Sequence, residues 1–315
     1  MSISFSQLEL VANMLRQHDL TLGDPLGRGM EGVVYEAGES TIAKLWFEKS
    51  LEDLDALKSF YDSANSETVS IRLPRILHVA RCGDISVSVE RRLSGSPLKP
   101  HVKTDAERLD NRVVDCIASV VMELSKIPGT REMKHLKVLG EPHALYEPSS
   151  EPWGSAITRV AFRRSERFRH LLARDIPDFD IRRKLLIDAI LGFASVDDAL
   201  IHGDICPENI LVDSDLKPVA VIDFGFLSSA GDPVFDAAVA SCITEMYGPF
   251  ALAHEHQMSK ALGPLLSGFD QRADLYKALY GLITSNAYDA NGEDGHYAFC
   301  VDLIRRPAVS QRLGI

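Results

Sequence analysis

Two short motifs that flank a predicted hairpin constrain this chain more than any other feature of its sequence. The first is His-Gly-Asp-Ile-Cys-Pro-Glu-Asn at residues 202–209, and the second is Asp-Phe-Gly at residues 223–225. Between them, the apolar segments 210–212 and 219–222 are joined by a polar turn, which is the pattern of a β-hairpin. Such a hairpin would bring three polar side chains to one end of its strands: Asp204, Asn209 and Asp223.

These three side chains suit phosphoryl transfer. Moving a phosphoryl group requires aligned reactants and neutralised charge rather than covalent help, so a positioned carboxylate and oxygen ligands for Mg²⁺ suffice. Asp204 would orient the acceptor hydroxyl and take its proton, and Asn209 and Asp223 would hold the metal. Either motif alone is better interpreted as a turn or a strand-end cap, because short motifs match by chance. Their order, spacing and strand context favour the catalytic interpretation.

A glycine-rich segment far upstream is the second independent signal. Its glycines, Gly27, Gly29 and Gly32, would let a loop between two strands approach phosphate oxygens through backbone N–H groups. A dinucleotide-binding site would need a helix at the third glycine, but a strand-like segment is found there instead. The next predicted strand, 41–46, carries Lys44 in the position of a lysine that anchors ATP phosphates. The alternative is an edge-strand lysine that resists aggregation.

The first 94 residues are predicted to form a small β-rich lobe. A helix over 4–17 precedes three strands that end near residue 47, and two more strands are predicted over 75–79 and 85–89. This makes a sheet of about five strands.

A helix predicted over 50–63 would place Leu51, Leu54, Leu57 and Tyr61 on its inner face. In a kinase, the helix at this place supplies the acid that pairs with the strand lysine. Glu52 is the candidate, with Asp53 and Asp55 as rivals. The alternative is that these acids only complement the helix dipole.

Residues 90–97 lose apolar periodicity and gain Gly, Ser and Pro, which indicates a linker. From it, Glu90 and Arg92 would offer backbone groups to adenine at the floor of a nucleotide cleft. The segments after it are predicted as helices: 105–125, 180–196, 235–247 and 259–284. The prediction is an α+β fold with a nucleotide-binding lobe at 1–94 and a larger, mainly helical lobe at 95–315 that holds the catalytic loop and the acceptor site. A length of 315 residues also favours two lobes.

From Gly27 to Asp236 the chain resembles the aminoglycoside phosphotransferase and choline kinase-like branch of the protein-kinase-like fold. The residues that carry the resemblance are Leu200 to Asp204, Pro207, Asn209, Ile222 to Gly225, and Gly231-Asp232-Pro233 with Asp236. The resemblance implies that Asp204 is the catalytic base and that Asn209 and Asp223 bind Mg²⁺. It also implies that Lys44 binds the ATP phosphates and that Asp236 buttresses the catalytic loop.

The spacing after Gly225 favours a small-molecule acceptor. Only residues 226–230 separate Gly225 from Gly231, which is too few for the activation segment on which protein kinases seat a peptide. Cys206 stands where most serine/threonine kinases have a lysine. The glycine loop, however, resembles the protein-kinase form, so a protein kinase stays an alternative. A nucleotide-binding pseudokinase is the third.

Two segments of opposite net charge favour opposite charges on the acceptor. Residues 241–302 hold eight acids and three bases, which suits a cationic acceptor such as an aminoglycoside or amino alcohol, or is simply a solvated acidic face. Residues 159–184 hold nine bases and four acids, which suits an anionic acceptor or an exposed helical face. The loop 141–154, with Tyr146 and Trp153, is a candidate lining of the acceptor site.

Composition excludes several other classes. A net charge of -11 and a pI of about 5.4 argue against a nucleic-acid partner. No run approaches the length of a membrane-spanning helix, and the N-terminus does not have the pattern of a signal peptide. We therefore expect the protein to be in the cytoplasm, where ATP is available. The five cysteines show no metal-ligand spacing, and Cys206 is the one expected to be accessible to alkylating reagents.

Overall fold

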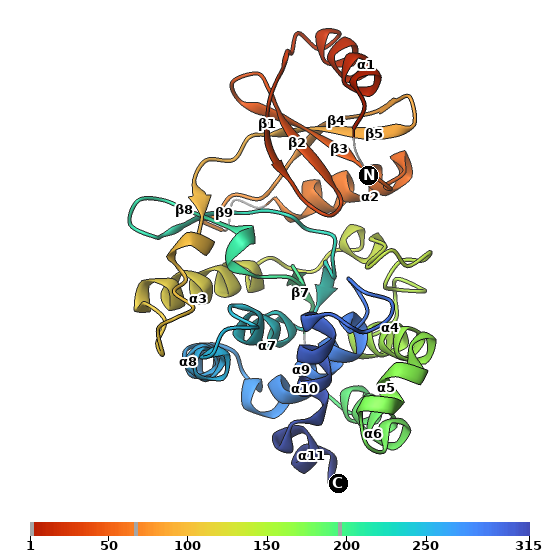
Figure 1. The fold of residues 1–315 in the computed structure, drawn as a ribbon, viewed down its shortest axis with the longest axis vertical. Coiled ribbons are helices and arrows are strands. Elements are labelled where there is room, and N and C mark those ends of the chain that lie inside the picture. The colour runs from red at the N-terminus through yellow and green to blue at the C-terminus, as the bar shows by residue number, and fades with distance from the viewer. Residues whose placement is uncertain (1–2, 66–68, 195–196) are drawn as a thin grey trace.

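In the computed structural model, which describes residues 3–65, 69–194 and 197–315, a small sheet sits above a larger helical body (Figure 1). The five antiparallel strands lie in the order β1-β2-β3-β5-β4, so the predicted five-stranded sheet is confirmed. Their bounds are β1 Leu22–Arg28, β2 Gly32–Ala37, β3 Thr41–Trp46, β4 Ile76–Cys82 and β5 Ile85–Arg91.

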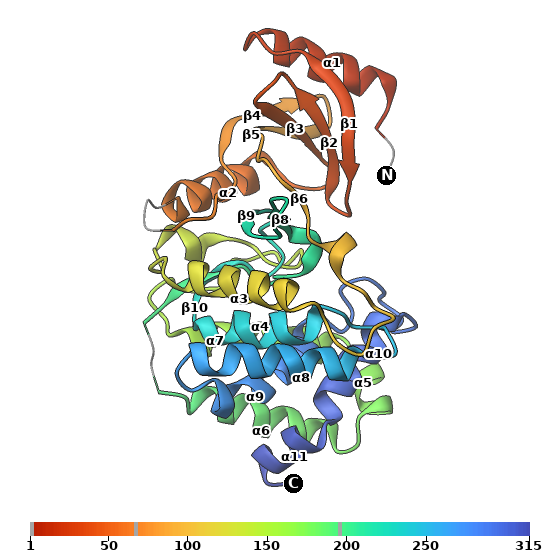
Figure 2. The same cartoon turned by 90° about the vertical axis from the view of Figure 1, so that its left-hand side faces the viewer.

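Two helices belong to this first part of the chain. Helix α1 (Phe5–Arg16) begins at a capping box of Ser4 and Gln7, as predicted, and packs Val11 and Leu15 against the outer face of the sheet. Helix α2 (Leu51–Ala64) lies between the sheet and the helical body (Figure 2). Its buried face is Leu54, Leu57, Phe60, Tyr61 and Ala64, whereas Leu51, which was predicted to face inward, is exposed.

Residues 92–95 connect β5 to the short strand β6 (Ser96–Pro97) and contain the predicted boundary at residue 94. The elements between this strand and the catalytic hairpin are η1 Lys99–His101, α3 Asn111–Ser125, η2 Glu132–His135, α4 Trp153–Arg167, α5 Arg169–Asp175, α6 Phe179–Leu191 and β7 Ala199–Ile201. After the hairpin come β10 Ser229–Gly231, α7 Pro233–Ile243, α8 Ala251–Leu262, η4 Gly263–Leu265, α9 Phe269–Thr284, α10 Gly295–Arg305 and α11 Pro307–Leu313.

Several predicted helix bounds were wrong for local reasons. Helix α3 begins at Asn111 rather than near residue 105, because the Asp110 side chain accepts the Arg112 N–H and caps it. The predicted single helix over 259–284 is the end of α8, the turn η4 and α9. Gly268, with φ +78°, separates the last two, and only glycine adopts this conformation readily. Helix α6 ends at Leu191, and the predicted end of that segment, residues 195–196, lies outside the described residues.

The predicted catalytic hairpin is confirmed. Strand β8 (Ile210–Val212) comes directly after the short helix η3 (Pro207–Asn209) and pairs with β9 (Pro218–Val221) in the register Ile210↔Val221. Beyond the Asp-Phe-Gly motif, β10 pairs with β7, just before the His-Gly-Asp motif. The two motifs are therefore held side by side, below the N-terminal sheet (Figure 1).

Candidate functional site

The catalytic loop is shaped by hydrogen bonds to its own backbone. The Asn209 side chain donates from Nδ2 to both the carbonyl and the Oδ2 of Asp204, at 3.0 Å each. The buried Asp236 carboxylate, in the first turn of α7, accepts the N–H groups of His202 and Gly203 at 2.7 Å each. Asp236 thus fixes the loop from below, as the family resemblance implied.

His202 links the two motifs. Its Nδ1 accepts the Asp204 N–H at 3.2 Å, so its Nε2 carries the hydrogen and donates to the Ile222 carbonyl at 3.0 Å. Burial lowers the pKa of His202 to about 4, which keeps the ring neutral at physiological pH. Ser228 adds a second link, because its hydroxyl accepts the Gly225 N–H and donates to the His202 carbonyl.

Asp223 is brought to this loop from the far side of the hairpin and is met there by Lys44 from strand β3. Lys44 Nζ lies 2.8 Å from Asp223 Oδ1, and the Asp223 side chain keeps 52% of its surface exposed. Asp223 adopts φ +66°, a left-handed conformation that is uncommon for residues other than glycine but that aspartate adopts more readily than most. The structure therefore brings together four residues singled out in the sequence: Lys44, Asp204, Asn209 and Asp223.

The two carboxylates have different electrostatic surroundings. Burial, together with the charge of Asp223, raises the pKa of Asp204 to about 7. Burial also acts to raise the pKa of Asp223, but the charge and hydrogen bond of Lys44 more than offset this and the pKa is lowered. One carboxylate can thus exchange a proton near neutral pH while its neighbour stays ionised.

The donor set fits Mg²⁺. This ion takes one or two protein oxygens and completes its shell with water and phosphates. Asp223 offers a half-exposed carboxylate, and Asn209 has its Nδ2 engaged with Asp204, which leaves its Oδ1 as the donor for a metal. Within the described ranges, no cluster of three or more His, Cys, Asp or Glu side chains suited to a metal occurs, so this carboxylate-amide pair is the candidate.

The glycine loop between β1 and β2 contains glycines of two kinds. A Cβ on Gly32 would lie 2.2 Å from the Leu45 carbonyl oxygen, so glycine is required there by the close approach of β3. A Cβ on Gly27 or Gly29 would meet no atom within 4 Å. Packing within the protein therefore accounts for Gly32, and only Gly27 and Gly29 remain as glycines free to face a ligand.

This difference predicts separable effects of alanine. Gly32→Ala is expected to destabilise the fold by about 1–3 kcal/mol, because the new methyl group overpacks the sheet. Gly29→Ala, whose φ is not in the left-handed region, is expected to change stability by less than about 0.5 kcal/mol and to weaken nucleotide binding. Urea unfolding and nucleotide titration of the two variants measure both quantities. Equal stability losses would show that the loop does not contain two kinds of glycine.

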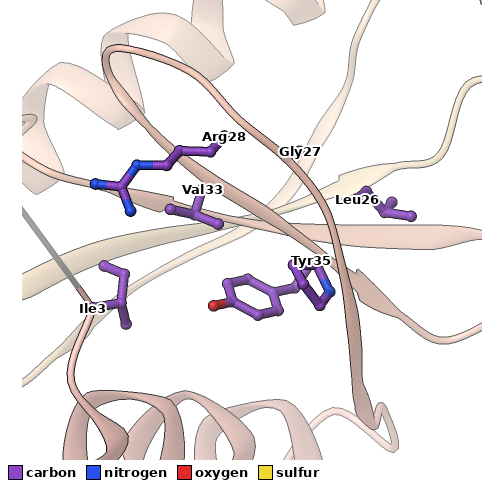
Figure 3. A pocket seen from close by; sticks show the side chains of 7 residues that line it. Ile3, Leu26, Gly27, Arg28, Val33 and Tyr35 are labelled. Atoms are coloured by element: carbon purple, nitrogen blue, oxygen red, sulfur yellow. The ribbon is translucent and has the colours of Figure 1, made fainter.

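A pocket of about 470 Å³ lies beside the same loop but on the other face of the sheet (Figure 3). Val33 and Tyr35 line it and are in register with Leu45 and Ala43, whereas Lys44 is in register with Val34. Because side chains alternate between the faces of a sheet, this pocket faces away from Lys44. It is therefore separate from the catalytic residues.

The predicted pairing of Lys44 with Glu52 is not what the structure shows. Lys44 has Asp223 as its ion-pair partner, and Glu52 lies exposed in the first turn of α2, beside a small pocket that it lines with Lys49 and Gly225. The rival Asp53 caps the helix at Ser50 and pairs with Lys137. The reason is the phase of α2, which turns its apolar side chains inward and its acids away from the strand.

The predicted adenine contacts also differ. The Arg92 N–H donates to the Ser40 carbonyl at 2.8 Å, and the Arg92 side chain pairs with Glu36. Glu90 is in register with Ile42 of β3 and Ile76 of β4, so its backbone lies in the interior of the sheet. The side chain of Glu90, rather than its backbone, is the part that faces the site.

Aromatic side chains lie beside Asp204. Tyr288, 46% exposed, stacks on Phe226 with ring centroids 6.2 Å apart and meets His296 edge to face at 4.8 Å. Burial and the charge of Asp204 both raise the pKa of Tyr288. Sequence reasoning missed these aromatic residues, because nothing in the local pattern joins Phe226 to a residue so far along the chain.

Tyr146 and Trp153, the aromatic residues predicted to line the acceptor site, are core residues instead. Tyr146 donates from its hydroxyl to the Ala230 carbonyl at 2.6 Å, and Trp153 packs between Tyr146 and Phe235. Cys206 is half-buried, and burial raises the pKa of its thiol. Because the thiolate is the reactive form, the expected alkylation of Cys206 is disfavoured.

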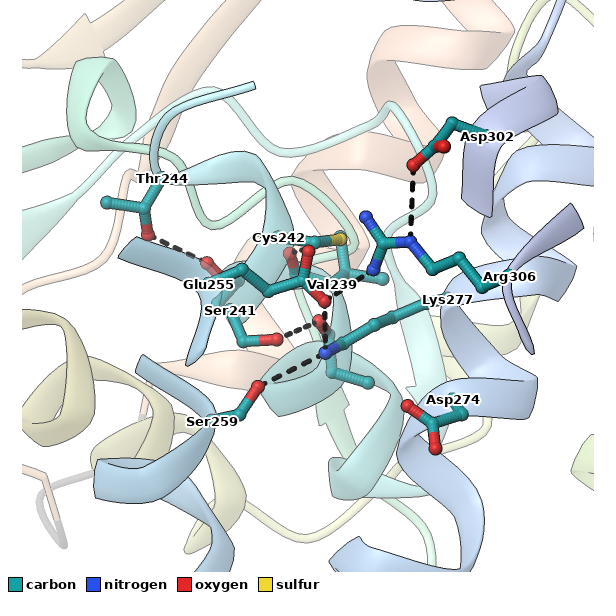
Figure 4. A network of polar contacts seen from close by, with 12 residues as sticks. Val239, Ser241, Cys242, Thr244, Glu255, Ser259, Asp274, Lys277, Asp302 and Arg306 are labelled. Carbon is teal, nitrogen blue, oxygen red and sulfur yellow. Dashed lines mark hydrogen bonds and ion pairs between the residues drawn. The ribbon is translucent and has the colours of Figure 1, made fainter. Parts of the chain in front are cut away.

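Acids of the C-terminal region pair with bases inside the fold, and Figure 4 shows this for Glu255 and Asp302. Glu255 pairs with Lys277 at 2.7 Å and with Arg306 at 2.6 Å, and Asp302 also pairs with Arg306. Asp294 caps α10. The basic segment behaves likewise, since Arg159 pairs with Glu151. Neither charge run therefore defines the acceptor.

Removing Asp236 is expected to disable the loop. Asp236→Ala would leave two buried N–H groups without an acceptor, at a cost of about 2–5 kcal/mol in the free energy of unfolding. Asp236→Asn keeps an oxygen for one of them and should lose less. Urea unfolding gives the stabilities, and equal stability of wild type and Asp236→Ala would show that the carboxylate does not support the loop.

Comparisons with known proteins agree with this geometry. A family model described as the phosphotransferase enzyme family matches residues 24–258. A search of curated proteins gave no match. Along the described parts of the chain, no helix is both long and apolar enough to span a lipid bilayer.

Solved structures share the fold at low identity. The GDP and kanamycin complex of APH(2″)-IIIa is 16% identical with a TM-score of 0.61, covering 94% of this chain and 98% of its own. The streptomycin-ATP-APH(2″)-IIa ternary complex is 12% identical with a TM-score of 0.59, covering 98% of both chains. Macrolide 2′-phosphotransferase MphH from Brachybacterium faecium is 14% identical with a TM-score of 0.57, covering 95% and 99%. These likenesses confirm the predicted two-lobed kinase-like fold.

Proposed function

The chain belongs to the phosphotransferase enzyme family, and we propose that it transfers the γ-phosphoryl group of ATP, in the presence of Mg²⁺, to a hydroxyl group of a small molecule. One observation carries the proposal. Lys44 from the sheet, Asp204 and Asn209 from the catalytic loop, and Asp223 from the far side of the hairpin converge on a single site. Phosphoryl transfer depends on positioning and charge stabilisation, which this set can provide.

Each residue has a definite part. Asp204 would accept the proton of the acceptor hydroxyl, since Asn209 orients its carboxylate and its raised pKa, about 7, suits proton transfer near neutral pH. Asp223 and Asn209 would hold Mg²⁺, which neutralises phosphate charge when it is bound. Lys44 would contact the phosphates. The loop would approach them closely at Gly27 and Gly29, where no side chain stands in the way; the Gly29 N–H itself donates to the Gly32 carbonyl.

The short segment after the Asp-Phe-Gly motif supports a small-molecule acceptor. After five residues the chain reaches Gly231 and then the Asp232 cap of α7, so no long segment is available to seat a peptide. We propose an aminoglycoside-type antibiotic, or a related amino alcohol or sugar, because the structural neighbours include complexes with kanamycin and streptomycin. The stacked faces of Phe226 and Tyr288 beside Asp204 would suit the ring of such a molecule. A cytoplasmic location would supply the ATP.

A nucleotide-consumption screen tests this function. The purified protein is mixed with ATP or GTP and Mg²⁺, and with aminoglycosides, macrolides, amino alcohols, sugars, or the proteins casein and myelin basic protein. We expect consumption above the acceptor-free rate with at least one small molecule and with neither protein. Acceptor-dependent consumption with the proteins alone would favour the protein-kinase alternative, and none with any acceptor would favour the pseudokinase.

A further inference from the structure

The acid that compensates the charge of Lys44 does not come from helix α2. That helix buries only apolar side chains and Tyr61 toward the sheet, and its acids Glu52 and Asp55 are exposed. Asp223 does pair with Lys44, but Asp223 is also the candidate Mg²⁺ ligand. When Mg²⁺ engages Asp223, a second carboxylate near Lys44 would still offset the charge of the lysine, and an uncompensated buried charge is costly.

Strand β5 provides a carboxylate on the same face of the sheet. Lys44 is in register with Ser88, and Ile42 is in register with Glu90. Residues two apart on a strand point the same way, so Lys44, Ser88 and Glu90 share one face. Glu36 of β2, which is in register with Ile42, lies on this face as well, but it pairs with Arg92. Glu90 is the buried acid of the face, with only 7% of its surface exposed.

A chain of hydrogen bonds fixes this carboxylate. The Trp46 indole donates from Nε1 to Ser88 Oγ at 2.9 Å, and the Ser88 hydroxyl donates to Glu90 Oε1 at 2.6 Å. Lys44 Nζ lies 3.9 Å from the centroid of the Trp46 ring, in cation-π contact. The lysine is thus linked to the carboxylate through two intervening side chains, first Trp46 and then Ser88.

The electrostatics agree with this geometry. Burial acts to lower the pKa of Lys44, but the charges of Asp223 and then Glu90 more than offset it and the pKa is raised. Burial raises the pKa of Glu90, and Lys44 and the Ser88 hydroxyl oppose that rise. Each group therefore stabilises the charged form of the other without a direct ion pair.

We infer that Glu90 is the resident counter-charge that positions Lys44 in the nucleotide site, in place of an acid from α2. Glu90 would keep Lys44 compensated and oriented toward the phosphates when Asp223 is engaged by Mg²⁺. It is a positioning residue, since it acts through Lys44 and does not touch the reacting atoms. This role rests on the proposed function, but the coupling between the two side chains can be measured without nucleotide.

A double-mutant cycle in the nucleotide-free protein tests the coupling. The variants are Lys44→Met, Glu90→Gln and their combination, and urea unfolding gives the equilibrium constant of each. In the wild type, Lys44→Met leaves Glu90 buried without its counter-charge. In the Glu90→Gln background there is no such charge, so Lys44→Met should change the unfolding constant about tenfold less than it does in the wild type. The matched cycle of Lys44→Met with Glu52→Gln should be additive to within about twofold. Additivity in the Glu90 cycle, or coupling in the Glu52 cycle instead, would overturn the inference.

Kinetics separate positioning from structural support. Glu90→Gln should lower kcat without raising the KM for nucleotide, and its loss of stability should not exceed the coupling measured in the cycle, because the substitution keeps the packing of the side chain. Ser88→Ala should act in the same direction and more weakly. If the wild type is active and Glu90→Gln has an unchanged kcat, the inference about Glu90 is overturned and the proposed function is not. A wild type that consumes no nucleotide would overturn the proposed function, and with it the role of Glu90 at the nucleotide.

Discussion

Asp204→Asn is expected to lower kcat by about 10²- to 10⁴-fold while nucleotide affinity stays close to that of the wild type. In the proposed function Asp204 would face the acceptor hydroxyl rather than the nucleotide, and its carboxylate is oriented by Asn209. An amide cannot accept the proton, so the loss should fall on the chemical step. Steady-state kinetics and calorimetry with a non-hydrolysable ATP analogue measure the two effects.

Asp204→Ala serves as the second variant, because it also removes the contact with Asn209. Asp215→Asn is the matched control, since Asp215 lies exposed in the turn of the same hairpin, away from the site. We expect Asp215→Asn to turn over like the wild type. Full turnover by a clean Asp204→Asn preparation would show that another group takes the proton.

The second large effect concerns the metal. Asp223→Ala is expected to abolish the Mg²⁺ dependence of nucleotide binding, because it removes the only carboxylate of the proposed pair, whereas Asn209→Ala should weaken that dependence less. Calorimetry with a non-hydrolysable analogue, in Mg²⁺ and then in EDTA, gives the comparison. A melting curve of each variant controls for loss of fold, since Asp223 also pairs with Lys44. Unchanged Mg²⁺ dependence in Asp223→Ala would place the metal elsewhere.

The parts of the fold that depend on local sequence could be predicted. The capping box at Ser4 and Gln7 began α1, and the apolar segments around the polar turn gave the catalytic hairpin in its observed place. Each of these signals is complete within a few residues. The convergence of Asp204, Asn209 and Asp223 resulted from the hairpin, so the centre of the site was predictable as well.

Features that depend on rotation or register were not predictable in the same way. Glu52 occurs in the expected helix, but the phase of α2 about its axis turns it away from Lys44. Glu90 was singled out for its backbone, and only the pairing of β5 with both β3 and β4 shows that its side chain faces the lysine. A shift of one residue in that pairing would have turned it to the opposite face.

Long-range packing accounts for the remaining differences. Tyr146 and Trp153 lie in a segment that resembles a ligand-binding loop, yet in the core Trp153 packs against Phe235 and Tyr146 packs against Trp153. Phe226 and Tyr288 meet only because α9 returns the chain to the catalytic loop. The excess of acids in the C-terminal region is present in the sequence, but the sequence does not show that Glu255 pairs with Lys277 inside the fold and is not free to attract a cationic acceptor.

The most direct test of the central claim is to follow labelled γ-phosphate from ATP onto an acceptor, with wild type and Asp204→Asn side by side. Each acceptor that gives consumption in the screen is incubated with both proteins, and the product is identified by phosphorus NMR. We predict a phosphate ester on a hydroxyl of a small molecule, formed by the wild type and slowed by at least about 10²-fold in Asp204→Asn. Asp204-dependent labelling of proteins and of none of the small molecules would contradict the account, as would equal product formation by the two proteins.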